Sequence, residues 1–81
     1  MKIDVLHSDI EYGIKRNCED CPIARAINRA LNNPSRTVEV THMTVYIGTE
    51  TFRLPTVATE FIRTFDDERE VRPFSFEMEI A

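Results

Sequence analysis

The sequence contains no tryptophan and only two glycines among 81 residues, and none of its apolar runs is long. A membrane-spanning helix needs roughly 18 or more consecutive apolar residues, which the chain does not supply. The opening residues MKIDVLHSD also lack the apolar segment of a secretory signal peptide. With so little glycine, neither a flexible linker nor a glycine-rich phosphate loop is expected. We therefore expect a cytosolic protein that forms one domain over residues 1–81, with reduced cysteines.

Basic residues are in the minority. Ten Lys and Arg stand against fourteen Asp and Glu, which gives a formal net charge of −4. The excess is local, because residues 60–79 carry seven acidic side chains and three arginines. Phosphate backbones require positive charge nearby, so a nucleic-acid partner is not expected. Tyr46 does not alter this view, because its predicted sheet face also carries Glu39, Glu77 and Glu79.

Helical spacing of apolar residues predicts two helices. The first covers residues 22–32, where Pro22 suits the first helical position. Its apolar stripe consists of Ile23, Ala26, Ile27, Ala30 and Leu31. The following residues NNPS are expected to end this helix and turn the chain.

The second helix lies in LPTVATEFIRTFDDE, with Thr56 as the expected N-cap. Its buried stripe consists of Ala58, Phe61, Ile62 and Phe65. A single helical turn is also predicted in HSDIEYG. There Ser8 and Glu11 have the spacing of a capping box, and Gly13 would end the turn.

Alternation of apolar and polar residues predicts the strands. Ile3 and Val5 share one side of an N-terminal strand, and residues 37–54 form a three-stranded meander with a tight turn or bulge near Thr41–Thr44. The final strand would point Phe74, Phe76, Met78 and Ile80 inward. The order β-α-β-β-β-α-β predicts a single α+β domain. We expect a mainly antiparallel, four- to five-stranded sheet with two helices packed on one face.

Several short motifs run through the chain in a fixed order. They are DIEYG, C-x-x-CPIA-x-AI, LP before a helix that contains FI-x-x-FD, and V-x-PFSFE. In these motifs the sequence resembles a family of small uncharacterised proteins encoded by bacteriophages and prophages. The resemblance covers most of the chain. It implies a compact α+β domain at work in the host cytoplasm, and it brings no catalytic residues with it.

Cys18 and Cys21 have the spacing of half a zinc site or of a redox pair. A complete Cys2His2 site would require His7 and His42 to converge on the two thiols. A redox role is also imperfectly matched, because Cys21 rather than Cys18 lies at the helix start and the acidic residues between them disfavour a thiolate. The third interpretation is packing of Cys21 under the helix start, with Cys18 in the preceding loop. We expect no bound metal or cofactor, and keep the thiol pair as a candidate site.

A basic cluster is the first candidate binding surface. Arg25 and Arg29 lie one turn apart on the polar face of the first helix, and Lys15, Arg16 and Arg36 are expected near its ends. Such a cluster binds a phosphate or an acidic protein surface, and a solvated helix face is the alternative.

The acidic run FDDERE is the second candidate surface, with Asp66, Asp67 and Glu68 as its central residues. A solvated loop is the ordinary interpretation of such a run. In a phage protein, carboxylates of this kind can also imitate DNA phosphates and occupy a host DNA-binding protein.

Catalytic patterns are absent from the sequence. It shows no Ser-His-Asp or Cys-His arrangement with telling spacing, and a chain this short is not expected to enclose a deep pocket. Our leading hypothesis is a non-enzymatic phage accessory protein that binds and modulates a host protein. The alternatives are an oligomeric binder that sequesters a signalling nucleotide, and a virion structural or assembly component. A homo-oligomer is compatible with each of them.

Overall fold

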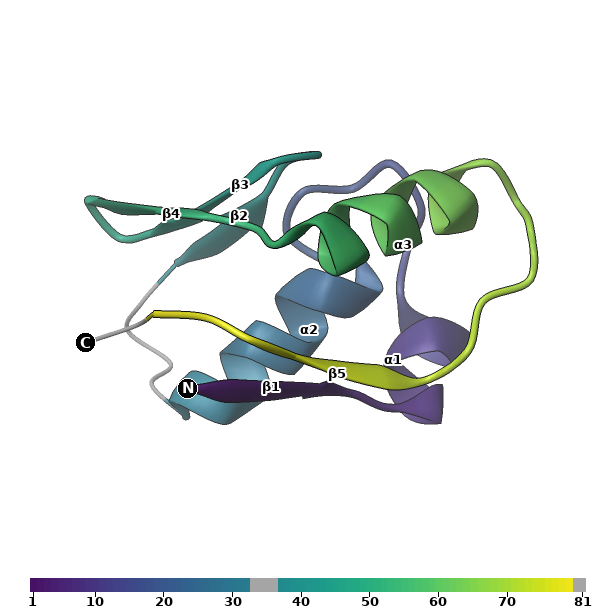
Figure 1. Cartoon of the computed structure of the whole chain (residues 1–81), viewed down its shortest axis with the longest axis horizontal. Coiled ribbons are helices and arrows are strands. Elements are labelled where there is room, and N and C mark those ends of the chain that lie inside the picture. Colours follow the sequence, from purple (N-terminus) through teal and green to yellow (C-terminus); the bar gives the residue numbers. More distant parts are fainter. Residues whose placement is uncertain (33–36, 80–81) are drawn as a thin grey trace.

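The computed structural model describes residues 1–32 and 37–79 of the chain. Figure 1 shows a mixed arrangement in which helix α2 lies between a three-stranded sheet and a two-stranded sheet. The elements, in chain order, are β1 (Lys2–Val5), α1 (His7–Tyr12), α2 (Pro22–Leu31), β2 (Val38–Val40), β3 (Thr44–Ile47), β4 (Glu50–Arg53), α3 (Thr56–Asp66) and β5 (Phe74–Glu77). The predicted α+β class is confirmed.

The strands are divided between two antiparallel sheets. Strand β1 pairs with β5, so that Ile3 lies opposite Phe76 and Val5 opposite Phe74. Strands β2, β3 and β4 form the predicted meander in sequence order. The expected single sheet of four to five strands is therefore replaced by sheets of two and three strands. The difference arises because β4 and β5 do not pair within the described residues.

Both turns of the meander are stabilised by residues within the turn itself. Thr41 and Thr44 close the first turn, in which the Thr41 hydroxyl accepts from the Thr44 amide at 3.1 Å. The second turn is the two-residue loop Gly48–Thr49 of the β3–β4 hairpin, in which Gly48 has a φ of 60°. Positive φ values at such a turn favour glycine. The predicted turn near Thr41–Thr44 is confirmed.

Helix α2 supplies the centre of the core. Ile23, Ala24, Ala26 and Ile27 are buried, and the helix contacts β1, β2 and α1. Of the predicted stripe, Ala30 is exposed, whereas Leu31 is partly buried and packs against the core. Asn32 ends α2 in a left-handed conformation with a φ of 49°. The NNPS segment that follows lies largely outside the described residues.

The N-cap of helix α1 lies two positions earlier than the predicted Ser8, and a different carboxylate caps the helix. Leu6 is the N-cap residue, and its backbone N–H donates to the Asp9 carboxylate at 2.8 Å. The expected Ser8–Glu11 capping box is therefore wrong. Gly13 ends the helix as predicted, by donating to the Asp9 carbonyl at 2.8 Å. A Cβ at Gly13 would lie 2.5 Å from that oxygen and 2.7 Å from the Pro22 ring, so only glycine fits between α1 and α2.

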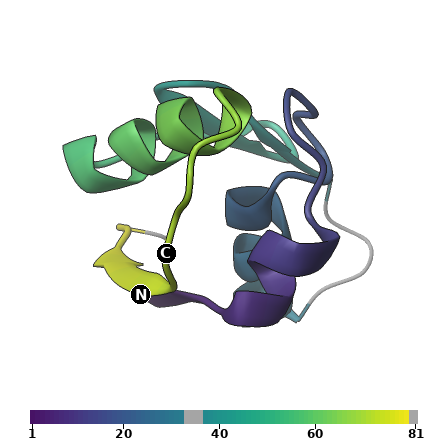
Figure 2. The same cartoon turned by 90° about the vertical axis from the view of Figure 1, so that its right-hand side faces the viewer.

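Helix α3 contacts strand β5 of the two-stranded sheet through aromatic side chains. Its N-cap is Pro55, so the predicted cap at Thr56 is wrong by one residue. Ala58, Phe61 and Ile62 are buried as predicted, and Phe65 packs against the core. The ring centroids of Phe61 and Phe74 lie 4.8 Å apart. This contact holds β5 beneath α3, and the connection between them runs down one side of the molecule (Figure 2).

Candidate functional site

The sequence-predicted site residues lie on three separate surfaces. Arg25 and Arg29 line a small polar pocket beside Asp9. Lys15 and Glu68 line a groove with the apolar residues Ile10, Ile14, Phe65 and Val71. The remaining predicted residues share one cleft, and they are Arg16, Cys18, Cys21, Asp66 and Asp67. Arg36 lies outside the described residues.

The two arginines of α2 point at a buried carboxylate. Asp9 is fully buried, and its two oxygens accept from the two terminal nitrogens of Arg29, each at 2.7 Å. Arg29 also donates to the Asp4 carbonyl at 2.7 Å, which fixes α2 to β1. The Arg25 Nε lies 3.8 Å from the nearer Asp9 oxygen, and the guanidinium lies over the Tyr12 ring. Arg25 and Arg29, predicted as a binding surface, are therefore directed toward Asp9, although their side chains remain 37% and 45% exposed.

Burial alone would raise the pKa of the Asp9 carboxyl. The hydrogen bonds from Arg29 and from the Leu6 amide, together with the charges of Arg29 and Arg25, outweigh this effect and hold the pKa below its ordinary value. The same pairing raises the pKa of Arg29. Asp9 therefore stays ionised in the folded protein, and Arg29 has a structural role.

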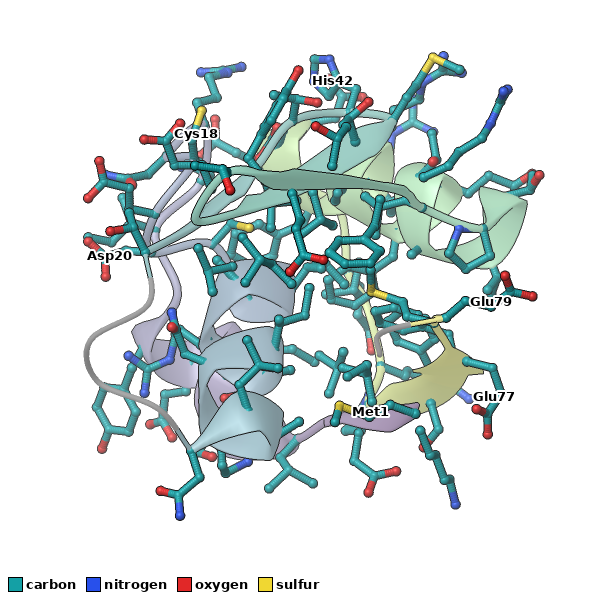
Figure 3. All side chains as sticks on the ribbon, turned by 90° about the vertical axis from the view of Figure 1, so that its left-hand side faces the viewer. Met1, Cys18, Asp20, His42, Glu77 and Glu79 are labelled. Atoms are coloured by element: carbon teal, nitrogen blue, oxygen red, sulfur yellow. The ribbon has the colours of Figure 1, made fainter. Side chains whose placement is uncertain are left out.

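The cleft that collects the other residues lies at the C-terminal end of α3, and we call it the α3 cleft. It has a volume of about 600 Å³. One wall is the loop before α2, with residues 16–18 and Cys21. A second wall comprises residues 40–42 at the β2–β3 turn. The third is α3, which contributes Ile62, Arg63 and Asp66, together with its C-cap residue Asp67. Figure 3 shows Cys18 and His42 at the same end of the molecule, far from Met1 and Glu77.

Backbone hydrogen bonds hold the loop wall in place. The Val40 amide donates to the Cys18 carbonyl at 2.7 Å, and the Arg16 amide donates to the Asp66 carboxylate at 2.9 Å. The Asn17 side chain accepts from the amides of Glu19 and Asp20, each at 3.0 Å. Because the loop is tied to both β2 and α3, the α3 cleft has a defined shape.

The two cysteines occupy different environments within this cleft. Both are free thiols, Cys18 exposed and Cys21 buried. Cys21 is the N-cap of α2, and its sulfur accepts from the Ala24 amide at 3.4 Å. Burial raises the pKa of the Cys21 thiol. This geometry supports the packing interpretation for Cys21. Among the described residues, no three His, Cys, Asp or Glu side chains are grouped closely enough to hold a metal ion.

The acidic side chains of the α3 cleft have partners in the chain, whereas the guanidinium groups of its two arginines, Arg16 and Arg63, have none among the described residues. Asp66 accepts from the Arg16 amide, and its carboxylate lies 3.7 Å from the His42 Nε2. Asp67 pairs with Arg69 at 3.2 Å. Within the part of the chain that the structure describes, the guanidinium groups of Arg16 and Arg63 form no hydrogen bond or ion pair. The Lys15–Glu68 pair lies next to the cleft and lowers the pKa of Glu68.

Sequence reasoning missed Arg63 and did not predict that Cys21, Val40 and Ile62 form the apolar floor of the cleft, and it considered His42 only as a zinc ligand. These residues come from three segments that only the fold brings together. One local signal existed: Arg63 precedes Asp66 and Asp67 by three and four positions on α3, which places all three on one helix face.

In comparisons with known proteins, no family model, no curated protein and no solved structure matches this chain. None of the helices in residues 1–32 and 37–79 has the length and hydropathy to cross a membrane.

Proposed function

We propose that this chain is a non-enzymatic binding protein that recognises another protein through the α3 cleft. The observation that carries the proposal is the composition of the cleft, which has an apolar floor surrounded by charged residues. Protein interfaces have this organisation, with an apolar centre and a polar rim. The resemblance of the sequence to small phage proteins supports a phage setting, in which the partner is a host protein in the bacterial cytoplasm.

The experiment is a pull-down from bacterial lysate with a tag at the C-terminus. This placement leaves the Met1 amino group free to donate to the Met78 carbonyl, which it does at 2.7 Å. The cleft variant is Arg16→Glu/Arg63→Glu. The control is Arg53→Glu/Arg72→Glu, which makes the same change of charge at exposed positions outside the cleft.

A bacterial protein that is retained by wild type and control but lost with the cleft variant supports the proposal. Equal recovery with all three chains would show that the α3 cleft is not the contact surface. The Arg25→Glu/Arg29→Glu pair is unsuitable for this test, because it would remove the partner of the buried Asp9.

A second candidate function is the sequestration of a signalling nucleotide, and the cleft volume favours it. About 600 Å³ falls within the ~300–1,000 Å³ range of small-molecule sites. Arg16 and Arg63 would then hold phosphate, and no oligomer would be needed to build the site. A rise in melting temperature with cyclic dinucleotides supports this function, because a ligand that binds only the folded state stabilises it. No rise across a broad panel would count against it.

A further inference from the structure

We infer that the element recognised in the α3 cleft is a carboxylate side chain next to an apolar side chain, presented by a partner polypeptide. This inference rests on the proposed function and adds the chemistry of the partner. It follows from the pairing of charges within the cleft, from the apolar floor and from the presence of a single aromatic ring, His42, among the described residues that line the cleft.

The sign of the partner's charge follows from which charged groups of the cleft already have a partner within the chain. Both carboxylates of the cleft already have a partner in the chain, the Arg16 amide for Asp66 and Arg69 for Asp67. The guanidinium of Arg63 has no partner within the described residues, and it lies on the same cleft. A partner carboxylate would supply the missing acceptor, and an arginine binds such a group with two parallel hydrogen bonds. A partner lysine would instead compete with the Arg16 amide and Arg69 for carboxylates that already have partners.

The requirement for an apolar side chain in the partner follows from the apolar floor of the cleft. Val40, Ile62 and the buried Cys21 line the cleft. An aliphatic side chain that covers this floor removes apolar surface from water. The two parts together define an acidic residue flanked by aliphatic residues.

Two observations favour a carboxylate over a nucleotide phosphate. A phosphate dianion would lie in the same cleft as Asp66 and Asp67, and repulsion by like charges increases with the second negative charge. His42 is the only aromatic residue that lines the cleft in the described part of the chain, whereas proteins that bind bases provide aromatic faces for stacking.

The test uses the full ¹⁵N-labelled chain and three soluble peptides. The probes are acetyl-Ile-Asp-Ile-amide and the same peptide with Asn or Lys in the centre, and AMP and inorganic phosphate form a separate arm. Amide chemical shifts identify the bound surface and give the affinity. The variant is Arg63→Gln, and the matched control is Arg53→Gln, an exposed arginine on β4 that does not line the cleft.

We expect the Asp peptide to shift the amides of residues 16–18, 40–42 and 62–67, and to bind more tightly than the Asn and Lys peptides. Arg63→Gln should weaken this binding by about threefold to fivefold, the scale of one exposed ion pair. Arg53→Gln should leave it unchanged. Equal binding of the Asp, Asn and Lys peptides, no shift with any peptide, or stronger binding of AMP or phosphate would each overturn the inference. The pull-down experiment shows whether such a result contradicts only the inferred chemistry of the partner or also the proposed function. A bacterial partner lost with the cleft variant keeps the function even if the peptides show no preference for acid.

Discussion

The two oxygens of the Asp9 carboxylate accept hydrogen bonds from the two terminal nitrogens of Arg29, each at 2.7 Å. Asp9 is completely buried, whereas the Arg29 side chain is 45% exposed. The pair joins α1 to α2, and the contact of Arg29 with the Asp4 carbonyl adds β1. One arginine therefore holds three elements at the N-terminal side of the fold.

Removal of the Arg29 side chain should strongly destabilise the protein. Arg29→Ala leaves Asp9 buried with only the more distant Arg25 as a cationic partner, and breaking a buried pair costs about 3–5 kcal/mol. Because Arg29 is partly exposed, we expect the lower end of this range. Urea denaturation followed by circular dichroism measures the change in the free energy of unfolding.

Arg25→Ala is the matched control for that experiment. Its Nε lies 3.8 Å from Asp9 and forms no hydrogen bond in the described structure, so the expected loss is about 1 kcal/mol. Equal losses for Arg25→Ala and Arg29→Ala would contradict the assignment of Arg29 as the principal partner.

The stability of the protein should depend on the ionisation of Asp9 in acid. The folded pKa of Asp9 is below its ordinary value, so the unfolded state binds more protons, and the contribution of Asp9 is complete above the unfolded pKa of about 3.9. This contribution is lost as the pH falls through the folded pKa. The difference in unfolding free energy between wild type and Asp9→Asn should therefore be largest near neutral pH and shrink below about pH 4. A difference that stays constant from neutral pH to pH 2 would show that the Asp9 charge is not responsible.

Substitution of Gly13 should be costly for steric reasons. The added Cβ of Gly13→Ala would overlap the Asp9 carbonyl and the Pro22 ring, and overpacking of this kind costs about 1–3 kcal/mol. Gly48→Asn provides the comparison, because nothing lies within 4 Å of a Cβ there and Asn tolerates a positive φ. Thermal unfolding should show a lower melting temperature for Gly13→Ala and little change for Gly48→Asn. The reverse order would show that α1 and α2 do not approach so closely.

The two thiols should differ in reactivity. In the native protein iodoacetamide should modify Cys18 alone, because Cys21 is buried and burial raises the pKa of its thiol. Mass spectrometry should show one adduct in buffer and two in denaturant, and Cys18→Ser should abolish the native adduct. Rapid modification of both thiols in buffer would mean that the helix start opens readily.

The sequence predicts the elements of this fold more completely than their arrangement. The spacing of Ile23, Ala26 and Ile27 and the alternation around Val45 and Ile47 are local consequences of helical and strand geometry, so periodicity reveals them. The division into two sheets depends on whether β4 meets β5, and no local pattern encodes that pairing.

Asp9 illustrates why the candidate site was predicted only in part. An aspartate in a short polar helix looks like a surface residue, and the arginines opposite the apolar stripe of α2 look solvated for the same reason. Packing of α1 across that face buries Asp9 completely and directs both arginines toward it, while their side chains stay partly exposed. The α3 cleft is likewise formed by three separate segments of the chain. The sequence therefore indicates its cysteines and its acidic residues as separate candidates, but does not predict that they lie close together.

The pairing of β1 with β5 has a consequence for synthesis on the ribosome. Strand β1 emerges early, but Ile3 must wait for Phe76 before its ladder can form. Helix α2 and the meander can assemble before then, and α2 can cover the apolar side of β1 while the edge of β1 that pairs with β5 stays open. Contacts between residues so distant in sequence form slowly. The two-stranded sheet thus acts as a late closing step, during which the nascent chain depends on α2 to shield its first strand.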